Sequence, residues 1–320
     1  MSFDHILKQI FSREELLKKP PVLLDIGASG RMNPKWASIA PYSICVAADA
    51  DDREMGYSES LNTRFKKSYI VHAIVTDHDQ GNIVFYFTRS PYCSSSLPPA
   101  EKKLEAWDFH SLFTVDSIKK IKAQSLRSIL AELDLDYIDW FKTDSQGTDL
   151  RLFASLPENC YSLVLAAEFE PGIIDAYIGE DKLWQVLEYM DRSNFWMSEF
   201  TLHGPRRLSK AVMEKNELDV SRLCLRTSPG WGELTYLKKI DPAGWSTREY
   251  LLAWVFACIE RQFGFAAEIA ACAGERYPEA IFATMKEFAC AMMQGNTIYK
   301  MFLRVIRYGL RKVERALRDC

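Results

Sequence analysis

The chain has 320 residues, a length that suggests about two domains. Of its residues 48% are hydrophobic and 26% are charged, which is the composition of an ordinary globular protein. Its net charge of −3 argues against a basic surface for nucleic acid, and we expect no nucleic-acid partner. The eight cysteines never form Cys-x-x-Cys, which argues against a zinc site and favours reduced thiols. We therefore expect no bound metal.

The N-terminal segment 1–20 predicts an amphipathic helix over 4–18 that ends before Pro20 and Pro21, because proline breaks a helix. The same segment is too polar and acidic for a secretory signal. The uncharged apolar run from Leu251 to Ile259 is too short to span a bilayer. These features predict a cytoplasmic protein.

Short apolar runs recur after this first helix, separated by helical or turn-rich segments. Strands that alternate with such connections imply a parallel sheet with both faces covered. The runs are 22–26, 44–48, 69–75, 137–143 and 162–168. They predict an α/β fold with a Rossmann-like, mostly parallel sheet.

The third run is followed by two features of a different kind. Gly81-Asn82 lies between His72–Thr76 and Ile83–Thr88 and predicts a hairpin there. Residues 89–112 are rich in serine, proline and tyrosine, and we interpret them as one long loop.

The second half of the sequence begins with strand signals and ends with helical ones. We expect a helix over 180–192 and late strands over Phe195–Leu202 and Leu234–Ile240. Ser246, with Glu249 three residues later, forms a capping box that begins a helical C-terminal region.

The segment Val22–Gly30 places an acid and two glycines at the end of a buried strand. Gly27 and Gly30, with Ala28 between them, permit a tight turn and let the backbone approach a ligand. The next apolar run ends in Asp49, whose carboxylate can accept hydrogen bonds from both hydroxyls of a ribose. The pair indicates a nucleoside-containing cofactor; the alternative is that the glycines only shape a turn.

This loop lacks the features that bind phosphate. A dinucleotide site needs a third glycine in Gly-x-Gly-x-x-Gly, and the chain has no Gly-x-x-x-x-Gly-Lys-Ser/Thr motif. Asp25 precedes Gly27 by two residues, so we expect its carboxylate to face the ligand, where it would repel pyrophosphate and attract a cation. S-adenosylmethionine, with its ribose, ammonium and sulfonium, fits these requirements.

Several acids each close an apolar run: Asp25, Asp49, Asp144 and Glu168. Ligands of open parallel sheets bind beyond the carboxyl ends of the strands, so we expect these acids around one crevice. Alternation places Lys142 on the same strand face as Asp144, where the two can hold each other's charge states and orient a substrate hydroxyl. The alternative for this pair is a structural ion pair.

These residues resemble the FkbM-type S-adenosylmethionine-dependent methyltransferases over roughly residues 20–240. Leu24–Gly30 resembles the first cofactor loop of that family, and Ala48–Asp51 stands in the place of its Phe-Glu-Pro-Asp segment. Ser94–Leu97 resembles its serine cluster. The most specific element is Phe141–Asp149, which resembles the Lys-x-Asp-x-Gln-Gly-x-Glu signature.

The sequence also departs from the family pattern. Asp49 replaces the usual glutamate, Ala48 replaces an aromatic residue, Arg127 replaces the usual aspartate, and Asp149 stands where glutamate is common. Asp49 still offers a carboxylate for the ribose, whereas the loss of the aromatic residue affects adenine stacking. The region 245–320 is not covered by the resemblance.

The resemblance implies a class I methyltransferase sheet, mostly parallel with late antiparallel strands, over a domain at 21–242, and a helical C-terminal region at 243–320. The implied reaction is transfer of a methyl group from S-adenosylmethionine to a hydroxyl of a glycan or small metabolite. Asp144 is the first candidate for positioning or base catalysis, with Lys142 as its electrostatic partner and Glu168 as the second candidate.

The remaining candidates divide between cofactor and acceptor. The cofactor-binding candidates are Asp25, Gly27, Ala28, Gly30, Asp49 and Asp77. The acceptor-side candidates are Ser94, Ser95, His110 and His203, each of which is alternatively a packing or solvent-facing residue. Two other functions stay open: a protein of a glycan-assembly pathway that binds the cofactor without transferring methyl, and an NAD-dependent oxidoreductase.

The last helix, predicted over 297–318 after Gly295, is basic along one stripe and apolar towards the other side. Such a helix can rest on an anionic membrane surface, here the inner face of a membrane, through residues 297–320. We favour the alternative in which it docks on its own protein or on a second subunit, so a homo-oligomer is a further expectation.

Overall fold

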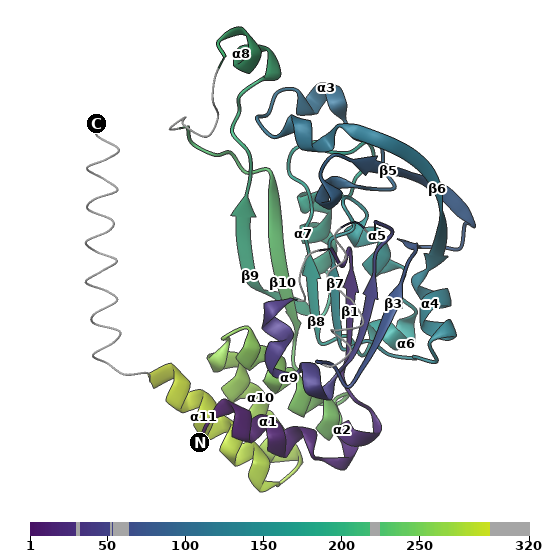
Figure 1. The fold of residues 1–320 in the computed structure, drawn as a ribbon. Helices are drawn as coiled ribbons and strands as arrows, with labels where there is room; N and C mark the ends of the chain where they lie inside the picture. The colour runs from purple at the N-terminus through teal and green to yellow at the C-terminus, as the bar shows by residue number, and fades with distance from the viewer. Residues whose placement is uncertain (30–32, 52, 54–63, 218–224, 295–320) are drawn as a thin grey trace, which may run out of the picture.

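The computed structural model describes residues 1–320 except 30–32, 52, 54–63, 218–224 and 295–320. Its main element is a seven-stranded sheet in the order β3-β2-β1-β7-β8-β10-β9 (Figure 1). Neighbours from β3 to β8 are parallel, whereas β10 runs antiparallel to both β8 and β9. The strands are β1 Val22–Ile26, β2 Ile44–Ala48, β3 Lys67–Val71, β7 Trp140–Thr143, β8 Ala166–Phe169, β9 Phe195–His203 and β10 Trp231–Lys238. The predicted α/β fold, parallel early and antiparallel late, is confirmed.

The central strands are apolar because helices cover both of their faces. All five residues of β1 are buried. Alternation sends Leu23 into the core on one side of the sheet and Leu24 into the core on the other side. A strand covered on both faces needs apolar residues at consecutive positions, which is why this run could be recognised in the sequence.

Four short helices cover one face of the sheet. They are α4 Leu126–Glu132, α5 Asp149–Ala154, α6 Glu158–Tyr161 and α7 Leu183–Asp191. Their apolar residues form one core with alternate residues of the central strands, including Leu24 and Phe141.

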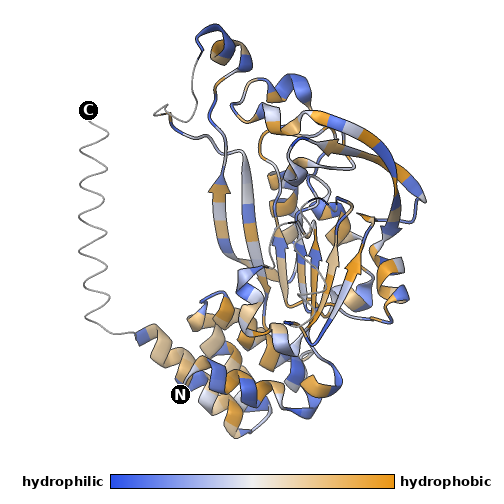
Figure 2. Cartoon of the chain, viewed as in Figure 1, coloured by the Kyte–Doolittle hydropathy of each residue, from blue (hydrophilic) through white to orange (hydrophobic). Residues whose placement is uncertain are grey.

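The N-terminal and C-terminal helices share the other face. They are α1 Phe3–Phe11, α2 Glu14–Lys18, α9 Thr247–Ile259, α10 Phe263–Arg276 and α11 Ala280–Gln294, and they gather at one end of the molecule (Figure 1). Helix α9 is buried around its circumference, as expected for an internal helix, and the C-terminal helices carry much hydrophobic sequence (Figure 2). Leu23, Trp140 and Trp254 lie in the same core cluster, so the C-terminal helices pack directly on the sheet.

The helix boundaries confirm one prediction and correct another. Ser246 and Glu249 form the predicted capping box at the start of α9. The predicted single helix over 4–18 is wrong, because α1 ends at a C-cap on Ser12 and α2 begins after the extended residue Arg13.

A second, three-stranded sheet contains β4 Ile74–Thr76, β6 Val115–Ser125 and β5 Asn82–Thr88, with β6 in the middle. The predicted hairpin between His72–Thr76 and Ile83–Thr88 is therefore wrong. β4 pairs in parallel with β6, and β5 pairs antiparallel with β6, so the two segments are not paired with each other. The run 69–75 is divided between β3 in the large sheet and β4 in the small one.

The segment 89–112, expected to be one long loop, contains short helical turns. They are η5 Pro91–Cys93, α3 Glu101–Leu104 and η6 His110–Phe113, the last of which ends just beyond the segment. The other short elements are η1 Pro34–Ser38, η2 Ala40–Tyr42 and α8 Lys210–Lys215.

Among the described residues, no helix is long and apolar enough to cross a membrane. Gly30 and the predicted basic helix at 297–318 lie outside the described residues.

Candidate active site

A pocket opens at the carboxyl ends of β1, β2 and β7, and we call it the strand-end pocket. Its lining includes Gly27, Ser29, Asp49, Asp144 and Gln146. Strand β1 lies between β2 and β7, so the strand order reverses direction here. Open α/β sheets bind ligands at such a reversal, beyond the carboxyl ends of the strands.

Gly27 is required by the packing of the chain against itself. Its backbone has φ +73°, and its N–H donates to the carbonyl of Ala48 at 2.9 Å. A Cβ at this position would lie 1.9 Å from the carbonyl oxygen of Asp144. The glycine thus lets the loops after β1 and β7 touch at the floor of the pocket. Ala28, the next cofactor candidate, is buried and also donates its N–H to Ala48.

Asp49 follows β2 and lines the same pocket. Its carboxylate accepts hydrogen bonds from the hydroxyl of Ser29 at 3.0 Å and from the N–H of Asp51 at 2.8 Å. Burial raises the pKa of Asp49, and the nearby charges of Asp51 and Asp25 add to the shift. A buried carboxylate held at a pocket wall can accept further hydrogen bonds from a ligand's hydroxyl groups.

A row of polar residues crosses five strands near this end of the sheet. In the strand register, Asp25 is paired with Lys142, Lys142 with Glu168, Glu168 with Thr235, and Thr235 with Glu199. Because each pair is directly opposite, all five side chains belong to one face of the sheet. Three of the residues predicted from the sequence are thus brought together by the register.

Lys142 has a different direct partner from the one expected. Its ammonium donates to Asp25 at 2.5 Å, so the predicted direct pairing with Asp144 is corrected to a pairing with Asp25. Burial opposes the charge on Lys142, but the negative charges of Asp25 and Asp144 outweigh burial and raise its pKa. Asp25 is 1% exposed, holds Lys142, and is not among the described residues that line the strand-end pocket.

Asp144 lies just beyond the end of β7. Its carboxylate accepts a hydrogen bond of 2.5 Å from the side-chain amide of Gln146. Burial raises the pKa of Asp144 to about 7, although the charge of Lys142 opposes the shift. A carboxyl group with such a pKa can exchange a proton near neutral pH.

Asp149 has a structural role in the same turn. Its buried carboxylate accepts hydrogen bonds from Thr143, from the N–H and hydroxyl of Ser145, and from the N–H of Glu170. Through these bonds, Asp149 attaches the turn that contains Asp144 to the chain just after the end of β8.

A second cavity, which we call the acidic groove, lies beside the strand-end pocket over β7, β8, β10 and β9. Its charged lining consists of Lys35, Lys142, Asp144, Glu168, Glu170, Glu199 and Glu233. Carboxylates therefore outnumber ammonium groups. Burial raises the pKa of Glu170 to about 10, and the charge of Asp144 adds to the shift.

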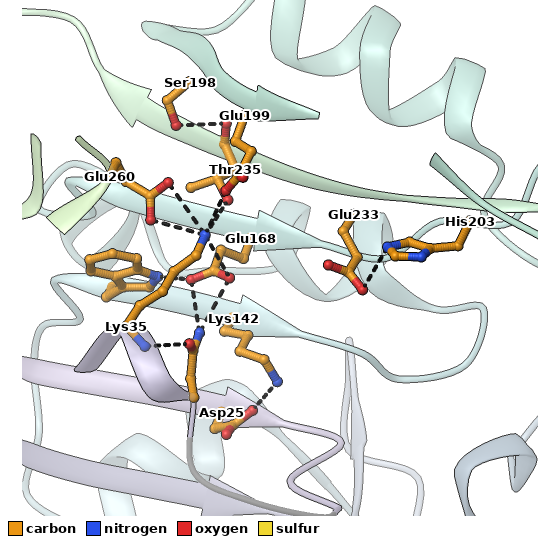
Figure 3. Close-up of polar contacts among 12 residues, drawn as sticks. Asp25, Lys35, Lys142, Glu168, Ser198, Glu199, His203, Glu233, Thr235 and Glu260 are labelled. Carbon is orange, nitrogen blue, oxygen red and sulfur yellow. Dashed lines mark hydrogen bonds and ion pairs between the residues drawn. The ribbon is translucent and has the colours of Figure 1, made fainter. Parts of the chain in front are cut away.

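Lys35 lies at the centre of the carboxylates at the inner end of the groove (Figure 3). Its ammonium lies 3.1 Å from Glu199 and 3.0 Å from Glu260, and donates to Thr235 at 3.1 Å. Glu168, the second predicted catalytic candidate, lies 3.9 Å from Lys35.

Glu168 is held mainly by neutral donors. Its carboxylate accepts from the indole N–H of Trp140 at 2.6 Å and from the amide of Asn33 at 3.2 Å. Sequence reasoning missed Lys35 and Asn33, which follow the glycine loop without any motif of their own.

The serine candidates mostly serve the loop that contains them. Ser94 lines the pocket, but its hydroxyl accepts from Arg53 at 3.0 Å and from the N–H of Thr88 at 3.1 Å. Ser95 is 1% exposed, and its hydroxyl donates to the carbonyl of Gln146 at 2.8 Å. These contacts join the loop to the turn after β7.

The histidine candidates and Asp77 lie further away. His110 contacts the carbonyl of Trp107 at 3.1 Å and lines neither cavity in the described structure. His203 pairs with Glu233 at 3.1 Å, which places it at the outer end of the acidic groove (Figure 3). Asp77 is exposed and contacts His78, outside the strand-end pocket.

Asp144 is the one described residue that lines both cavities. A ligand in the strand-end pocket and a second molecule in the acidic groove would therefore meet at this residue. The arrangement can orient two molecules and accept a proton between them. No family model matches the chain, and no curated protein matches it.

Proposed function

We propose that this chain is an S-adenosylmethionine-dependent methyltransferase that acts on a hydroxyl group of a glycan or small metabolite. The observation that carries the proposal is the position of Asp144 between the strand-end pocket and the acidic groove. One cavity holds the cofactor, the other holds the acceptor, and the carboxyl group of Asp144 faces the atoms that react.

The chemistry of the strand-end pocket supports this cofactor. Asp49 suits the ribose hydroxyls, and Ile74, Val75 and Phe85 give the pocket an apolar wall for the adenine. The carboxyl group of Asp144 attracts the sulfonium cation of S-adenosylmethionine, whereas it would repel the pyrophosphate of NAD. The lining contains no lysine or arginine to bind a phosphate, in the part of the chain that the structure describes.

The reaction needs alignment and one proton acceptor. The acceptor oxygen attacks the methyl carbon, so that the oxygen–carbon bond forms while the carbon–sulfur bond breaks and S-adenosylhomocysteine leaves. The hydroxyl proton passes to Asp144, whose pKa of about 7 suits a base at neutral pH. The ion pair of Lys142 and Asp25 lies beside Asp144, and the two cavities hold the reacting atoms in line.

Calorimetric titration with S-adenosylmethionine and S-adenosylhomocysteine tests the proposal. We expect both ligands to bind the wild-type protein, and we expect Asp49→Ala to weaken both at least tenfold because two hydrogen bonds to the ribose are lost, each worth about 1 kcal/mol. Asp191→Ala, which removes an exposed aspartate at the end of α7, is the matched control. Failure of a folded wild-type protein to bind either ligand, or binding of NAD instead, contradicts the proposal.

A further inference from the structure

The side chain of Gln146 connects the carboxyl group of Asp144 to a buried tyrosine. Its amide nitrogen donates to Asp144 at 2.5 Å, and its amide oxygen lies 2.8 Å from the hydroxyl of Tyr177. Tyr177 is 5% exposed, and its hydroxyl also lies 2.9 Å from the carbonyl of Cys93. An ionised carboxylate accepts hydrogen bonds and donates none, so the nitrogen of the amide faces Asp144 and its oxygen faces Tyr177.

The backbone at Gln146 is held in an unusual conformation. Its φ is +57°, which residues other than glycine seldom adopt and which carries strain. The hydroxyl of Ser95 binds the carbonyl of Gln146 at 2.8 Å, and the N–H of Asp181 binds the carbonyl of Gly147 at 2.7 Å. Several elements thus hold the turn in the one conformation that points the amide at Asp144.

We propose that Gln146 and Tyr177 are positioning residues that orient the carboxylate of Asp144 and stabilise its charged form for the transfer reaction. Gln146 supplies the hydrogen bond, and the hydroxyl of Tyr177, 2.8 Å from the amide oxygen, holds the other end of the amide. The inference rests on the proposed function for its meaning, but the contact itself can be tested on the ligand-free protein.

Other charged groups near Asp144 also affect the pKa of its carboxyl group, in addition to Gln146. Lys142 on β7 favours the charged carboxylate, whereas Asp149 on α5 and Asp25 on β1 oppose it. The carboxyl group of Glu170, beyond β8, lies close enough for the charge of Asp144 to raise its pKa. The thiol of Cys93 and the hydroxyl of Tyr177 also lie within reach of the charge of Asp144. Substitution of Gln146 leaves all of these groups in place.

The first measurement follows the carboxyl carbon of Asp144 by NMR while pH is varied, in protein labelled with ¹³C-aspartate. The resonance is assigned by its loss in Asp144→Asn. We expect a titration midpoint that moves upward by roughly one unit in Gln146→Asn, because the shorter amide no longer donates to the charged carboxylate. Asparagine tolerates positive φ, so this variant keeps the turn.

Two further variants separate positioning from general loosening. Tyr177→Phe removes one hydroxyl and should raise the midpoint by a smaller amount. Ser95→Ala removes one of the contacts that hold this turn but leaves the amide itself in place, so its midpoint should move less than that of Gln146→Asn. An unchanged midpoint in both Gln146→Asn and Tyr177→Phe overturns the inference, and so does an equal shift in Ser95→Ala.

A second measurement separates this inference from the proposed function. If Asp144 faces the sulfonium, the preference for S-adenosylmethionine over S-adenosylhomocysteine rises with pH as Asp144 ionises, and in Gln146→Asn it rises at higher pH. Asp144→Asn is the control: its pH dependence reports the titration of the ligands themselves, without the titration of Asp144. A shifted NMR midpoint without binding of either ligand would support the positioning role and refute the methyltransferase proposal.

Discussion

A buried ion pair between Arg248 and Asp139 joins the C-terminal helices to the sheet. Two guanidinium nitrogens of Arg248, in the first turn of α9, donate to the two carboxylate oxygens of Asp139 at 2.8 Å each. The two side chains are 6% and 0% exposed. Asp139 also accepts the N–H of Val22 at the start of β1, so the pair connects α9 to two central strands.

Arg248→Met should destabilise the protein strongly, because it leaves the carboxylate of Asp139 buried without its cation. Removing one partner of a buried pair costs about 3–5 kcal/mol. For a chain of this size, such a loss lowers the melting temperature by on the order of 10 °C. The matched control is Arg192→Met, which breaks the exposed pair with Glu188 on α7 and should cost about 0–1 kcal/mol.

Thermal melting and urea unfolding of both single variants measure this difference. The double variant Arg248→Met/Asp139→Asn should be clearly less destabilised than the sum of its single variants, since no uncompensated charge stays buried. If Arg248→Met costs no more than Arg192→Met, or if the double variant is additive, the ion pair does not fasten α9 to the sheet.

Two further predictions concern the floor of the pocket and the inner end of the groove. Gly27→Ala should lower both the melting temperature and the affinity for S-adenosylmethionine, because the added Cβ would clash with the backbone of Asp144. The control is Gly81→Ala, at φ +71° with open space around it, which measures the cost of the backbone conformation alone. Equal melting temperatures for the two variants would contradict the predicted clash. Lys35→Met should destabilise the protein more at pH 8 than at pH 5.5. Burial raises the pKa of Glu168, and it raises the pKa of Glu260 to about 7. Such carboxyl groups favour folding while they are protonated and disfavour it as pH rises through the folded pKa. Melting curves at the two pH values measure the second effect, and an equal loss at both would show that Lys35 does not neutralise these groups.

The central strands of the large sheet were predictable because a strand that is buried on both faces appears in the sequence as a continuous apolar run. The runs at 22–26 and 44–48 match β1 and β2 residue for residue. Strand β6 carries no such mark. Its large apolar residues Val115, Ile118 and Ile121 are spaced by three, and much of the strand is exposed, so it lacks the alternation that predicts a strand.

The pairing of distant strands was not predictable from local patterns. A strand does begin at Asn82, but Ile74 pairs with Ala123, far along the chain, and not with that strand. The same reason explains the partner of Lys142. Local alternation predicts the same strand face for Lys142 and Asp144, whereas the pairing of Lys142 with Asp25 follows from the register between β1 and β7, which no short motif records.

The contact between Gln146 and Tyr177 joins two segments that are far apart in the sequence. Gln146 and Tyr177 meet because the turn after β7 packs on the segment before α7, where a Cβ on Gly147 would lie 3.5 Å from the ring of Tyr177. A sequence motif contains the residues of one turn. The orientation of Asp144 depends on a residue from another turn, brought there by the fold.

Helix α9 connects the stability of the sheet to the electrostatics of the acidic groove. Arg248 at its first turn holds Asp139 before β7, and Glu260 at its C-cap binds Lys35 at the inner end of the groove. Lys35 in turn lies beside Glu168, in the polar row that begins at Asp25 and passes through Lys142. The C-terminal helical region, which the family resemblance leaves uncovered, therefore supplies one of the carboxylates that set the charge of the groove. Altering this region should change the site as well as the stability of the fold.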